Sequence, residues 1–428
     1  MVLTGRAALL AALGMPLVAL APFHATWIGW SVLVALACLA DRTLAAHPRH
    51  VEVTRRTPAA VRLGEATSSE LVVRVTGRRR LRGTVRDAWQ PSAGTGRDRH
   101  RVDLGPGEAV RLRTPLRPTR RGDRHADLVT VRSLGPAGLA GRQASHEAPA
   151  RLRVLPEFAS RKHLPSRLAR LRELDGRAAV QVRGQGTEFD SLREYVIGDD
   201  VRSIDWRATA RRSEVVVRTW RPERDRRVLL LLDTGRTSAL RVGDAPRLDA
   251  SIEAALLLGA LATHAGDRVE LVAYDRRVRA RAQGTTGARL MPALADALAT
   301  VEPELTETDW AGAAAAVKAR LSQRALVVVL TAIEPAAVES GLLEAVAGLD
   351  HQVVVASVRD PELEALRAGR GDVHAVFDAA AAERAQLERD AVVLRLRQRG
   401  AEVVDAVPDE LAPALADRYL ALKAAGRL

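Results

Sequence analysis

Residues Gly184–Asp233 read GQGTEFDSLREYVIGDDVRSIDWRATARRSEVVVRTWRPERDRRVLLLLD. The segment is too charged for a core, and it is too rich in aromatics and glycine for a plain linker. It leads directly into an apolar run, Val228 to Leu232, that ends on Asp233. An apolar strand that ends on an acidic residue is typical of an open α/β sheet, which presents ligands at the carboxyl ends of its strands.

Apolar strands and amphipathic helices alternate from Arg227 to the C-terminus. The pattern predicts strands at residues 228–233, 267–274, 278–282, 325–333, 352–358 and 401–407. It predicts helices at residues 248–265, 286–301, 309–321, 335–349, 377–398 and 410–425. Because the longest strands are continuously apolar, we expect a parallel sheet that is covered by helices on both faces.

The region before this domain has a different pattern. Short stretches that alternate between apolar and polar residues are separated by Gly and Pro, at residues 51–54, 71–75, 109–116 and 128–132. Alternation with a period of two and this spacing predicts a small antiparallel β-sandwich over residues 50–157. A basic connector then leads into the charged segment, and the two together occupy residues 158–226.

The N-terminal segment carries no Asp, Glu, Lys or Arg from Ala7 to Ala40. A spanning helix needs about 20 apolar residues, and Pro22 interrupts this longer run. We therefore expect two transmembrane helices within residues 1–42, roughly Arg6–Ala21 and Ala25–Ala40. The alternatives are a signal peptide cleaved after the A-x-A-like residues 19–21, followed by one helix, and a buried helical hairpin.

Basic residues follow the second apolar stretch at positions 42, 49, 55 and 56. The positive-inside rule then places the large C-terminal part in the cytoplasm, with the chain in the plasma membrane as a multi-pass protein. The net charge of +13 also raises the possibility of nucleic-acid binding, but aromatics make up only 3% of the residues. We expect no nucleic-acid partner and expect the positive charge to face an anionic membrane. The single cysteine, Cys38, excludes an intrachain disulfide and a Cys-based zinc site.

The segment Gly186–Ala210 follows the pattern G-T-E-F-x-x-L-R-E-Y-x-x-G-D-D-x-R-x-I-D-W-x-A-x-A. This pattern resembles the signature of the family called domain of unknown function 58. The resemblance covers most of the chain and implies a von Willebrand factor A-type, Rossmann-like domain over residues 227–428. It also implies a membrane protein that acts beside MoxR-type AAA+ ATPases.

The von Willebrand resemblance further implies a metal-ion-dependent adhesion site, whose first loop reads D-x-S-x-S in strong binders. The matching run begins at Asp233, with Gly235 in place of the first hydroxyl and Thr237 in place of the second. Thr308 is the candidate from a later loop. Ala332 stands where the resemblance implies an aspartate, and Glu334 follows in a different register. Magnesium prefers six oxygen ligands that include carboxylates, so the sequence predicts at most a degenerate Mg²⁺ site at Asp233, Thr237 and Thr308.

Two interpretations fit the charged segment. Its candidate interaction residues are Glu188, Arg193, Tyr195, Gly198, Asp199, Asp200, Arg202, Asp205, Trp206 and Arg218. In the first interpretation, the three arginines pair with the glutamate, Asp199 and Asp205 above a packed Trp206 and Tyr195, and lock the segment onto the sheet edge or the sandwich. In the second, the same surface docks a partner.

We expect a membrane-anchored, non-enzymatic scaffold that has no catalytic residues. The alternative is a metal-dependent hydrolase that uses Asp199, Asp200 and Asp205. The sequence offers no nearby histidine or cysteine nucleophile to complete such a site.

Overall fold

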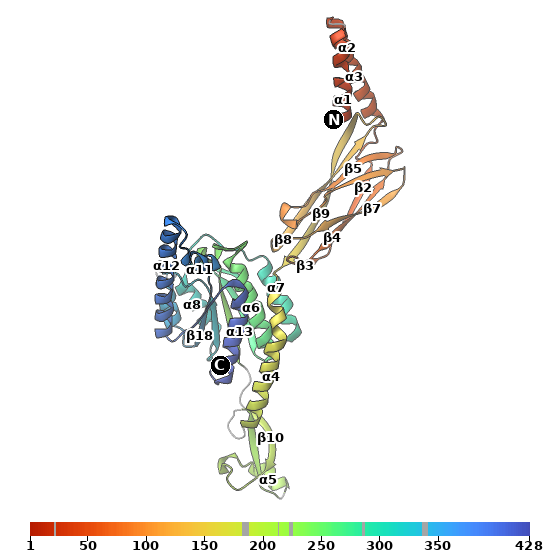
Figure 1. Cartoon of the computed structure of the whole chain (residues 1–428). Helices are drawn as coiled ribbons and strands as arrows, with labels where there is room; N and C mark the ends of the chain where they lie inside the picture. Colours follow the sequence, from red (N-terminus) through yellow and green to blue (C-terminus); the bar gives the residue numbers. More distant parts are fainter. Residues whose placement is uncertain (21–22, 182–187, 213, 222–225, 285–286, 336–340) are drawn as a thin grey trace. The chain divides into compact units, whose positions relative to one another are not determined.

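The computed structural model of the chain contains two compact units, Met1–Glu157 and Phe158–Leu428 (Figure 1). The structure describes residues 1–20, 23–181, 188–212, 214–221, 226–284, 287–335 and 341–428. The side chains of residues 175–181, 188–191, 212 and 219–221 lie outside this description.

The apolar N-terminal segment forms three helices rather than two. They are α1 (Gly5–Ala12), α2 (Gly14–Leu20) and α3 (His24–Leu44). Only α3, among the helices that the structure describes, is long and apolar enough to cross a membrane. The expectation of two spanning helices is not supported, because the first half is divided at Leu13 into two short helices.

Helix α3 extends past its predicted end at Ala40 to include Asp41. The Asp41 carboxylate is buried and accepts the backbone N–H groups of Ala137, Leu139 and Ala140 at 2.7 to 2.9 Å. A buried carboxylate that is satisfied by three backbone donors is stable, and it ties the end of α3 to the turn before β9.

The first unit continues as two sheets that share an apolar core. One sheet has the order β1-β9-β8-β5-β6, with β3 paired to β9, and the other has the order β2-β4-β7. Leu71 and Val73 from the second sheet pack with Leu81, Val85 and Val129 from the first, which is the arrangement of a β-sandwich. The strands are β1 (Val2–Leu3), β2 (Val51–Arg56), β3 (Ala60–Arg62), β4 (Thr67–Val75), β5 (Leu81–Asp87), β6 (Arg99–Leu104), β7 (Ala109–Leu116), β8 (Gly122–Leu134) and β9 (Ala140–Leu155).

The long strand β9 was not predicted from the sequence. It contains Pro149, which removes a backbone donor and argues against a central strand. The structure accommodates this proline where the pairing register with β8 shifts between Ala126 and Leu128. A bulge at that point leaves one residue unpaired, so the proline does not interrupt the ladder.

The second unit is built on a six-stranded sheet with the order β16-β15-β12-β17-β18-β19. Every pair is parallel except β15 with β16. The strands are β12 (Arg227–Asp233), β15 (Arg268–Tyr274), β16 (Val278–Ala282), β17 (Leu326–Leu330), β18 (Gln352–Val358) and β19 (Glu402–Ala406). The short strands β13 (Arg241–Val242) and β14 (Ala245–Pro246) form a separate ladder.

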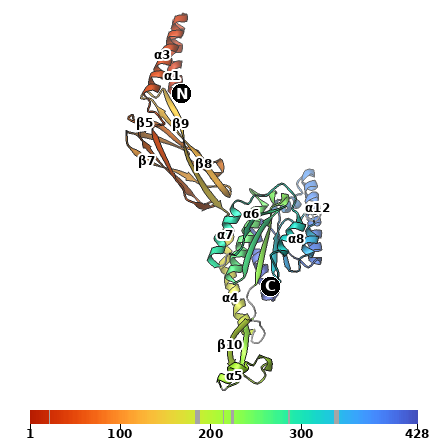
Figure 2. The same ribbon diagram turned by 180° about the vertical axis from the view of Figure 1, so that it is seen from behind.

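Helices cover both faces of this sheet, as Figures 1 and 2 show from opposite sides. In β12, Leu230 and Leu232 pack on one face, and Leu229 and Leu231 pack on the other. The first face is covered by α4 (Leu164–Gln181), α6 (Arg247–His264), α7 (Leu290–Ala299) and α13 (Pro408–Ala424). The second is covered by α8 (Trp310–Lys318), α10 (Leu342–Ala347) and α12 (Val373–Gln398). Burial on both faces explains why these strands have no apolar–polar alternation.

Several predicted boundaries differ in this unit. Strand β17 ends at Leu330, three residues before its predicted end, and α11 (Pro361–Arg367) was not predicted. In the helix predicted over residues 335–349, Pro335 is helical, residues 336–340 lie outside the described residues, and α10 spans Leu342–Ala347. Asp360 caps α11 by accepting the Glu362 N–H, a signal that was present in the sequence.

The signature segment, Glu188–Arg221, forms a two-stranded antiparallel hairpin that carries a helical excursion between its strands. Its elements are β10 (Glu188–Glu194), the 3-10 turn η3 (Val201–Ser203), α5 (Trp206–Arg212) and β11 (Val216–Arg221). Residues 184–187, 213 and 222–225 of the quoted sequence lie outside the described residues.

Candidate functional site

The carboxyl edge of the α/β sheet gathers hydroxyl groups around one buried acid. Asp233 ends β12 and is 2% exposed. Its Oδ1 accepts the Thr308 hydroxyl at 2.5 Å and the Gly235 N–H at 2.8 Å. Its Oδ2 accepts the hydroxyls of Thr331 at 2.6 Å and of Thr237 at 3.3 Å. We call these five residues the Asp233 cluster.

Local structure places each donor. Thr308 precedes Asp309, whose side chain caps α8 by accepting the Gly312 N–H and whose own N–H donates to Asp275 O. Thr331 directly follows β17, and Leu232 pairs with Leu330 in the parallel ladder. Asp233 and Thr331 therefore leave adjacent strands side by side.

Gly235 is required by the close approach of Thr308. A Cβ atom at position 235 would lie 2.1 Å from Thr308 Oγ1 and 3.0 Å from the backbone oxygen of Thr306. A serine, as in the D-x-S-x-S pattern, cannot fit without moving Thr308 or the loop. The missing hydroxyl and the direct bond from Thr308 to Asp233 are therefore two parts of the same arrangement.

Burial raises the pKa of Asp233, and the hydrogen bonds from Thr308, Thr331, Gly235 and Thr237 oppose that rise only in part. The neighbouring Asp275 behaves differently. Burial also raises its pKa, but hydrogen bonds from the Arg276 N–H and from Arg279 outweigh burial, so the pKa lies below its usual range.

This arrangement does not fit a magnesium site. Magnesium needs near-octahedral oxygen ligands with carboxylates to offset its dehydration. Asp233 is the one carboxylate of its cluster, and both of its oxygens already accept hydrogen bonds. Ala332 is fully buried and supplies no ligand atom, and Glu334 pairs with Arg247 at 2.7 Å. Among the residues that the structure describes, no group of three or more His, Cys, Asp or Glu side chains could hold a metal ion.

The predicted metal residues Asp233, Thr237 and Thr308 thus do meet, but as donors and acceptor of one hydrogen-bonded cluster. The sequence interpretation missed Thr331 and Asp275. Both follow strands that lie beside β12, at the end where Asp233 stands. Their position after two apolar strands was a usable signal.

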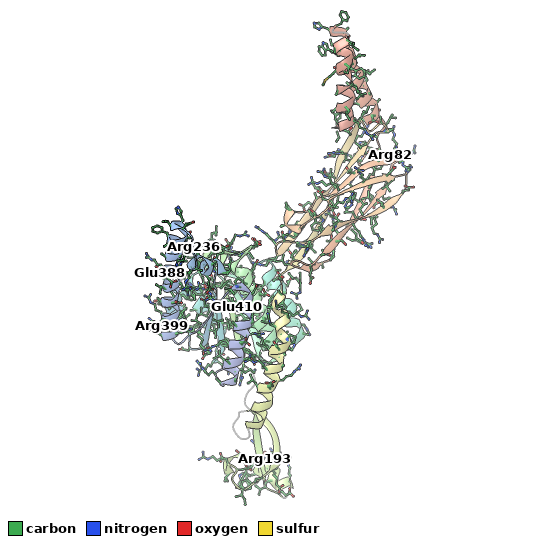
Figure 3. All side chains as sticks on the ribbon, viewed as in Figure 1. Arg82, Arg193, Arg236, Glu388, Arg399 and Glu410 are labelled. Atoms are coloured by element: carbon green, nitrogen blue, oxygen red, sulfur yellow. The ribbon has the colours of Figure 1, made fainter. Side chains whose placement is uncertain are left out.

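The signature segment is braced by its own ion pairs. Arg193 contacts both oxygens of Asp199, at 2.5 and 2.8 Å (Figure 3 labels Arg193). Arg218 donates to Asp205 Oδ2 at 2.9 Å. The Arg193 guanidinium lowers the pKa of Asp199. Hydrogen bonds from the Ala208 N–H and then from Arg218 lower the pKa of Asp205.

Backbone turns complete the brace. Gly198 has a φ of 112° in a turn where the Asp199 N–H donates to Val196 O at 3.0 Å. The Asp200 carboxylate accepts the Arg202 N–H at 3.0 Å and caps η3. The Tyr195 N–H donates to Val215 O at 2.8 Å, and the Tyr195 side chain is half-buried.

One detail of the predicted clasp is wrong, and another lies outside the described side chains. The Arg202 side chain forms no ion pair with a described side chain, and its remaining predicted partner, Glu188, is not among them. Trp206 was expected to pack beneath the ion pairs, but its side chain is 67% exposed. Trp206 is the first residue of α5, where Asp205 accepts the N–H groups of Arg207 and Ala208 and fixes the helix start without help from the indole. The predicted pairing of Glu188 lies outside the described side chains.

The bracing leaves large apolar side chains exposed on the same segment. Ile197 is 96% exposed, and four other side chains of the segment are also exposed. These four are Val196, Val201, Trp206 and Val215. We call these five side chains the apolar set of the signature segment.

The fold and the two sites describe an α/β protein that carries an exposed hairpin module, a β-sandwich and one helix able to cross a membrane. A family model described as "Protein of unknown function DUF58" matches residues 191–404, which is half of the chain. The chain belongs to this family.

The comparisons with single proteins are weaker. The "Uncharacterized protein YeaD" of Bacillus subtilis (strain 168) is 25% identical over 158 residues, which cover 37% of this chain and 38% of the relative. The alignment therefore spans well under half of that protein. A solution structure of a CARDB domain from Pyrococcus furiosus is 20% identical and covers 24% of this chain and 94% of that chain, with a TM-score of 0.20. The native conformation of E. coli alpha-2-macroglobulin is 17% identical and covers 25% of this chain and 7% of that chain, with a TM-score of 0.21. Such TM-scores carry no argument about fold or function.

Proposed function

We propose that the chain is a membrane-anchored, non-enzymatic adaptor that docks a partner protein through its signature segment. The observation that carries this proposal is the apolar set of that segment, which is exposed although the segment around it is internally braced. The partner implied by the family resemblance is a MoxR-type AAA+ ATPase. Together with this ATPase, the adaptor would assemble or activate other proteins.

The bracing supports docking over an internal clasp. The ion pairs Arg193–Asp199 and Arg218–Asp205 join residues of the segment to each other. Isolated surface ion pairs contribute little to stability, but a bidentate arginine fixes geometry. A small module that holds its own shape and exposes five apolar side chains among arginines has the composition of an interface.

We further propose that the α/β unit is of the von Willebrand factor A type and acts without a metal ion. Five parallel strands, an antiparallel edge strand and an acidic residue at the carboxyl edge support the first part. The saturated hydrogen bonding of Asp233 supports the second.

Helix α3 supplies the proposed anchor. It exposes apolar side chains along its length, including Trp27, Val32 and Leu36. Arg42 lies in the last turn of α3, and Arg49 lies in the loop after it. Under the positive-inside rule, these arginines support a cytoplasmic location for the remainder of the chain. Arg55 contributes less to a membrane-facing charge in the folded protein, because its side chain is buried against Asp87. Helices α1 and α2, with Leu13 between them, measure about 24 Å at 1.5 Å per residue. This length is shorter than a hydrocarbon core of about 30 Å, so the two helices would cross the membrane only where the bilayer is thinner.

No observation favours the hydrolase alternative. Asp199, Asp200 and Asp205 accept hydrogen bonds from neighbouring backbone N–H groups, and two of them also pair with arginines. The pKa values of Asp199 and Asp205 are lowered, which is opposite to what a general acid requires.

The test is co-purification of the detergent-solubilised chain with a MoxR-type ATPase. The variant combines Ile197→Asp with Trp206→Ala. The matched control is Leu387→Asp, which places the same charge at an exposed leucine on α12. We expect the double variant to lose binding at least tenfold and the control to bind as the wild type. Equal binding by all three proteins would overturn the docking proposal.

A further inference from the structure

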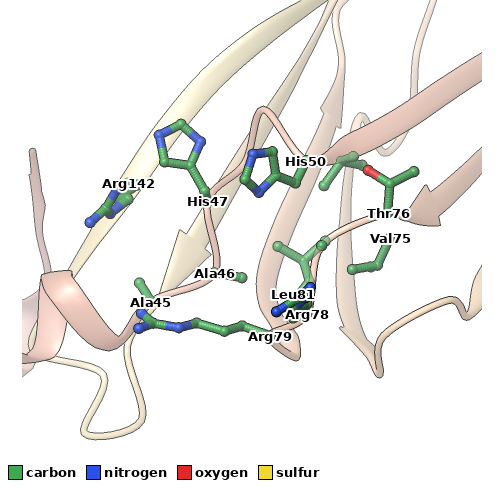
Figure 4. Close-up of a pocket in the computed structure, with 12 residues that line it drawn as sticks. Ala45, Ala46, His47, His50, Val75, Thr76, Arg78, Arg79, Leu81 and Arg142 are labelled. Carbon is green, nitrogen blue, oxygen red and sulfur yellow. The ribbon is translucent and has the colours of Figure 1, made fainter.

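A cavity of about 500 Å³ lies where the candidate spanning helix meets the β-sandwich (Figure 4). Its lining begins at Ala45, one residue after α3 ends, and includes the loop between β4 and β5. The floor is apolar and buried, and it consists of Ala45, Ala46, Val51, Val75 and Leu81.

The rim of this α3 cavity is basic. It consists of His47, His50, Arg78, Arg79 and Arg142. No Asp or Glu lines the cavity. None of the three arginines forms an ion pair with an acidic side chain anywhere in the described residues. An uncompensated cluster of this kind attracts an anion.

Some arginines elsewhere on the sandwich do pair with carboxylates. Arg80, two residues beyond Arg78, pairs with Asp103 at 2.6 Å. Arg86 pairs with Asp98, and Arg113 pairs with Glu70, both at 2.8 Å. The sandwich therefore neutralises some of its arginines, and those around the α3 cavity are among the arginines that it leaves without a carboxylate.

Two rim arginines are already positioned by the end of α3. Arg142 Nε donates to Arg42 O at 3.1 Å, and Arg79 donates to Thr43 O. These carbonyls belong to the last turn of the helix, where backbone acceptors are otherwise unsatisfied. Each guanidinium uses one nitrogen for this contact, which leaves further N–H groups for a ligand.

The length of α3 sets the level of the cavity. Its apolar part, His24–Ala40, measures about 26 Å at 1.5 Å per residue, which is close to a hydrocarbon core of about 30 Å, and Asp41 after it already contacts the sandwich. If α3 spans a bilayer, the residues that follow Leu44 emerge at the headgroup level. The cavity is then open at the depth where lipid phosphates lie.

We propose that the α3 cavity binds the phosphate headgroup of an anionic phospholipid from the leaflet in which α3 ends. Arginine matches phosphate oxygens in a bidentate geometry, and the histidines add ring N–H donors. The apolar floor accommodates the glycerol and the first methylene groups. The proposal rests on the proposed anchoring by α3, and it adds lipid recognition to that anchor.

The experiment uses the chain in nanodiscs of phosphatidylcholine alone or with phosphatidylglycerol, and native mass spectrometry measures the lipid that remains bound. The test variant is Arg78→Gln with His50→Gln, because neither side chain contacts the helix end. The control is Arg111→Gln, which removes an exposed arginine outside the cavity. We expect retained phosphatidylglycerol on the wild type and the control, and a loss of roughly fivefold or more on the test variant.

A second arm adds glycerol phosphate as a soluble competitor, which separates lipid from free phosphate. Competition without retained lipid would replace the proposal by a soluble phosphate ester. Equal losses of bound phosphatidylglycerol in the test variant and the control would overturn the proposal and assign the binding to general surface charge.

Carbonate extraction of native membranes tests the anchor by itself. If the chain resists extraction but shows no preference for phosphatidylglycerol, the inference fails and the anchor stands. Release by carbonate would overturn both.

Discussion

The Asp233 cluster and the signature segment are both organised around aspartate carboxylates, yet they use them in opposite ways. Asp233 is buried, its oxygens are saturated by hydroxyl and N–H donors, and its pKa is raised. Asp199 and Asp205 are partly exposed, pair with arginines, and have lowered pKa values. The first arrangement closes a sheet edge where ligands would be expected, whereas the second holds an exposed surface in shape. The difference places the proposed binding function away from the sheet edge.

The largest expected effect comes from removing the buried acceptor. Asp233→Ala leaves the hydroxyls of Thr308 and Thr331 and the Gly235 N–H without their acceptor. We expect the free energy of unfolding of the α/β unit to fall by roughly 3 kcal/mol, since each buried unsatisfied group costs about 1 to 3 kcal/mol. Urea denaturation of the detergent-solubilised chain measures it.

The informative control is Asp233→Asn, which keeps an oxygen for Thr308 and Gly235. It should cost much less than the alanine variant, because the cluster depends on hydrogen bonds and not on charge. If the asparagine variant were as unstable as the alanine variant when Mg²⁺ is present, but more stable than it when Mg²⁺ is absent, the edge would be shown to bind metal.

A second variant restores the hydroxyl of the D-x-S-x-S pattern. Gly235→Ser places a Cβ against Thr308 Oγ1, so we expect a loss of about 2 kcal/mol from overpacking. Thr308→Ala removes the obstructing atom. In a double-mutant cycle, combining Thr308→Ala with Gly235→Ser should therefore recover part of the stability that Gly235→Ser loses. Strict additivity of the two changes would contradict the direct contact.

The pH dependence of stability should have opposite signs in the two regions. The folded pKa of Asp233 is raised, so an unfolded carboxyl, with a pKa of about 3.9, releases its proton first as pH rises. The stability of the wild type relative to Asp233→Asn should therefore fall as pH rises from about 4 through the folded pKa. Unfolding free energies of both proteins across this range test the sign.

The folded pKa of Asp199 is lowered, and the sign reverses. The advantage of the wild type over Asp199→Asn should be complete above about pH 4 and should disappear as pH falls through the folded pKa. A slope of the same sign for both aspartates would show that the burial difference between the regions is wrong.

The smallest effect is expected from Arg193→Gln. Its partner Asp199 is solvated, and exposed ion pairs contribute little, so the unfolding midpoint should not change measurably. A lowered affinity for the ATPase without a change in that midpoint would show that the ion pair serves the shape of the segment. A large fall in the midpoint would instead favour the clasp.

The sequence predicted the α/β sheet well because its strands are continuously apolar. The strand predicted at residues 228–233 became β12 with little change, and the strand predicted at residues 325–333 became the shorter β17. Strand β9 was missed because Pro149 and its polar residues hide the alternation. In the Asp233 cluster, the von Willebrand resemblance pointed to Thr237 and Thr308. The position of Thr331 after an apolar strand was a usable signal, but its contact with Asp233 also depends on β17 lying beside β12, which is a tertiary property.

The exposure of Trp206 could not be predicted for a related reason. An aromatic residue beside paired charges resembles a packed anchor, but its environment depends on where α5 begins. Asp205 fixes that start, and the indole remains at the surface.

The most direct measurement is the affinity of the chain for the nucleotide-free MoxR-type ATPase, with Mg²⁺ and with chelator, for the wild type, Asp233→Asn and Ile197→Asp/Trp206→Ala. Without nucleotide, chelation leaves the partner unchanged. Docking through the signature segment predicts equal affinity for the wild type and Asp233→Asn in both conditions, and a loss of at least tenfold for the double variant. Binding that disappears with chelator and in Asp233→Asn, but survives in the double variant, would contradict it and return the function to the sheet edge.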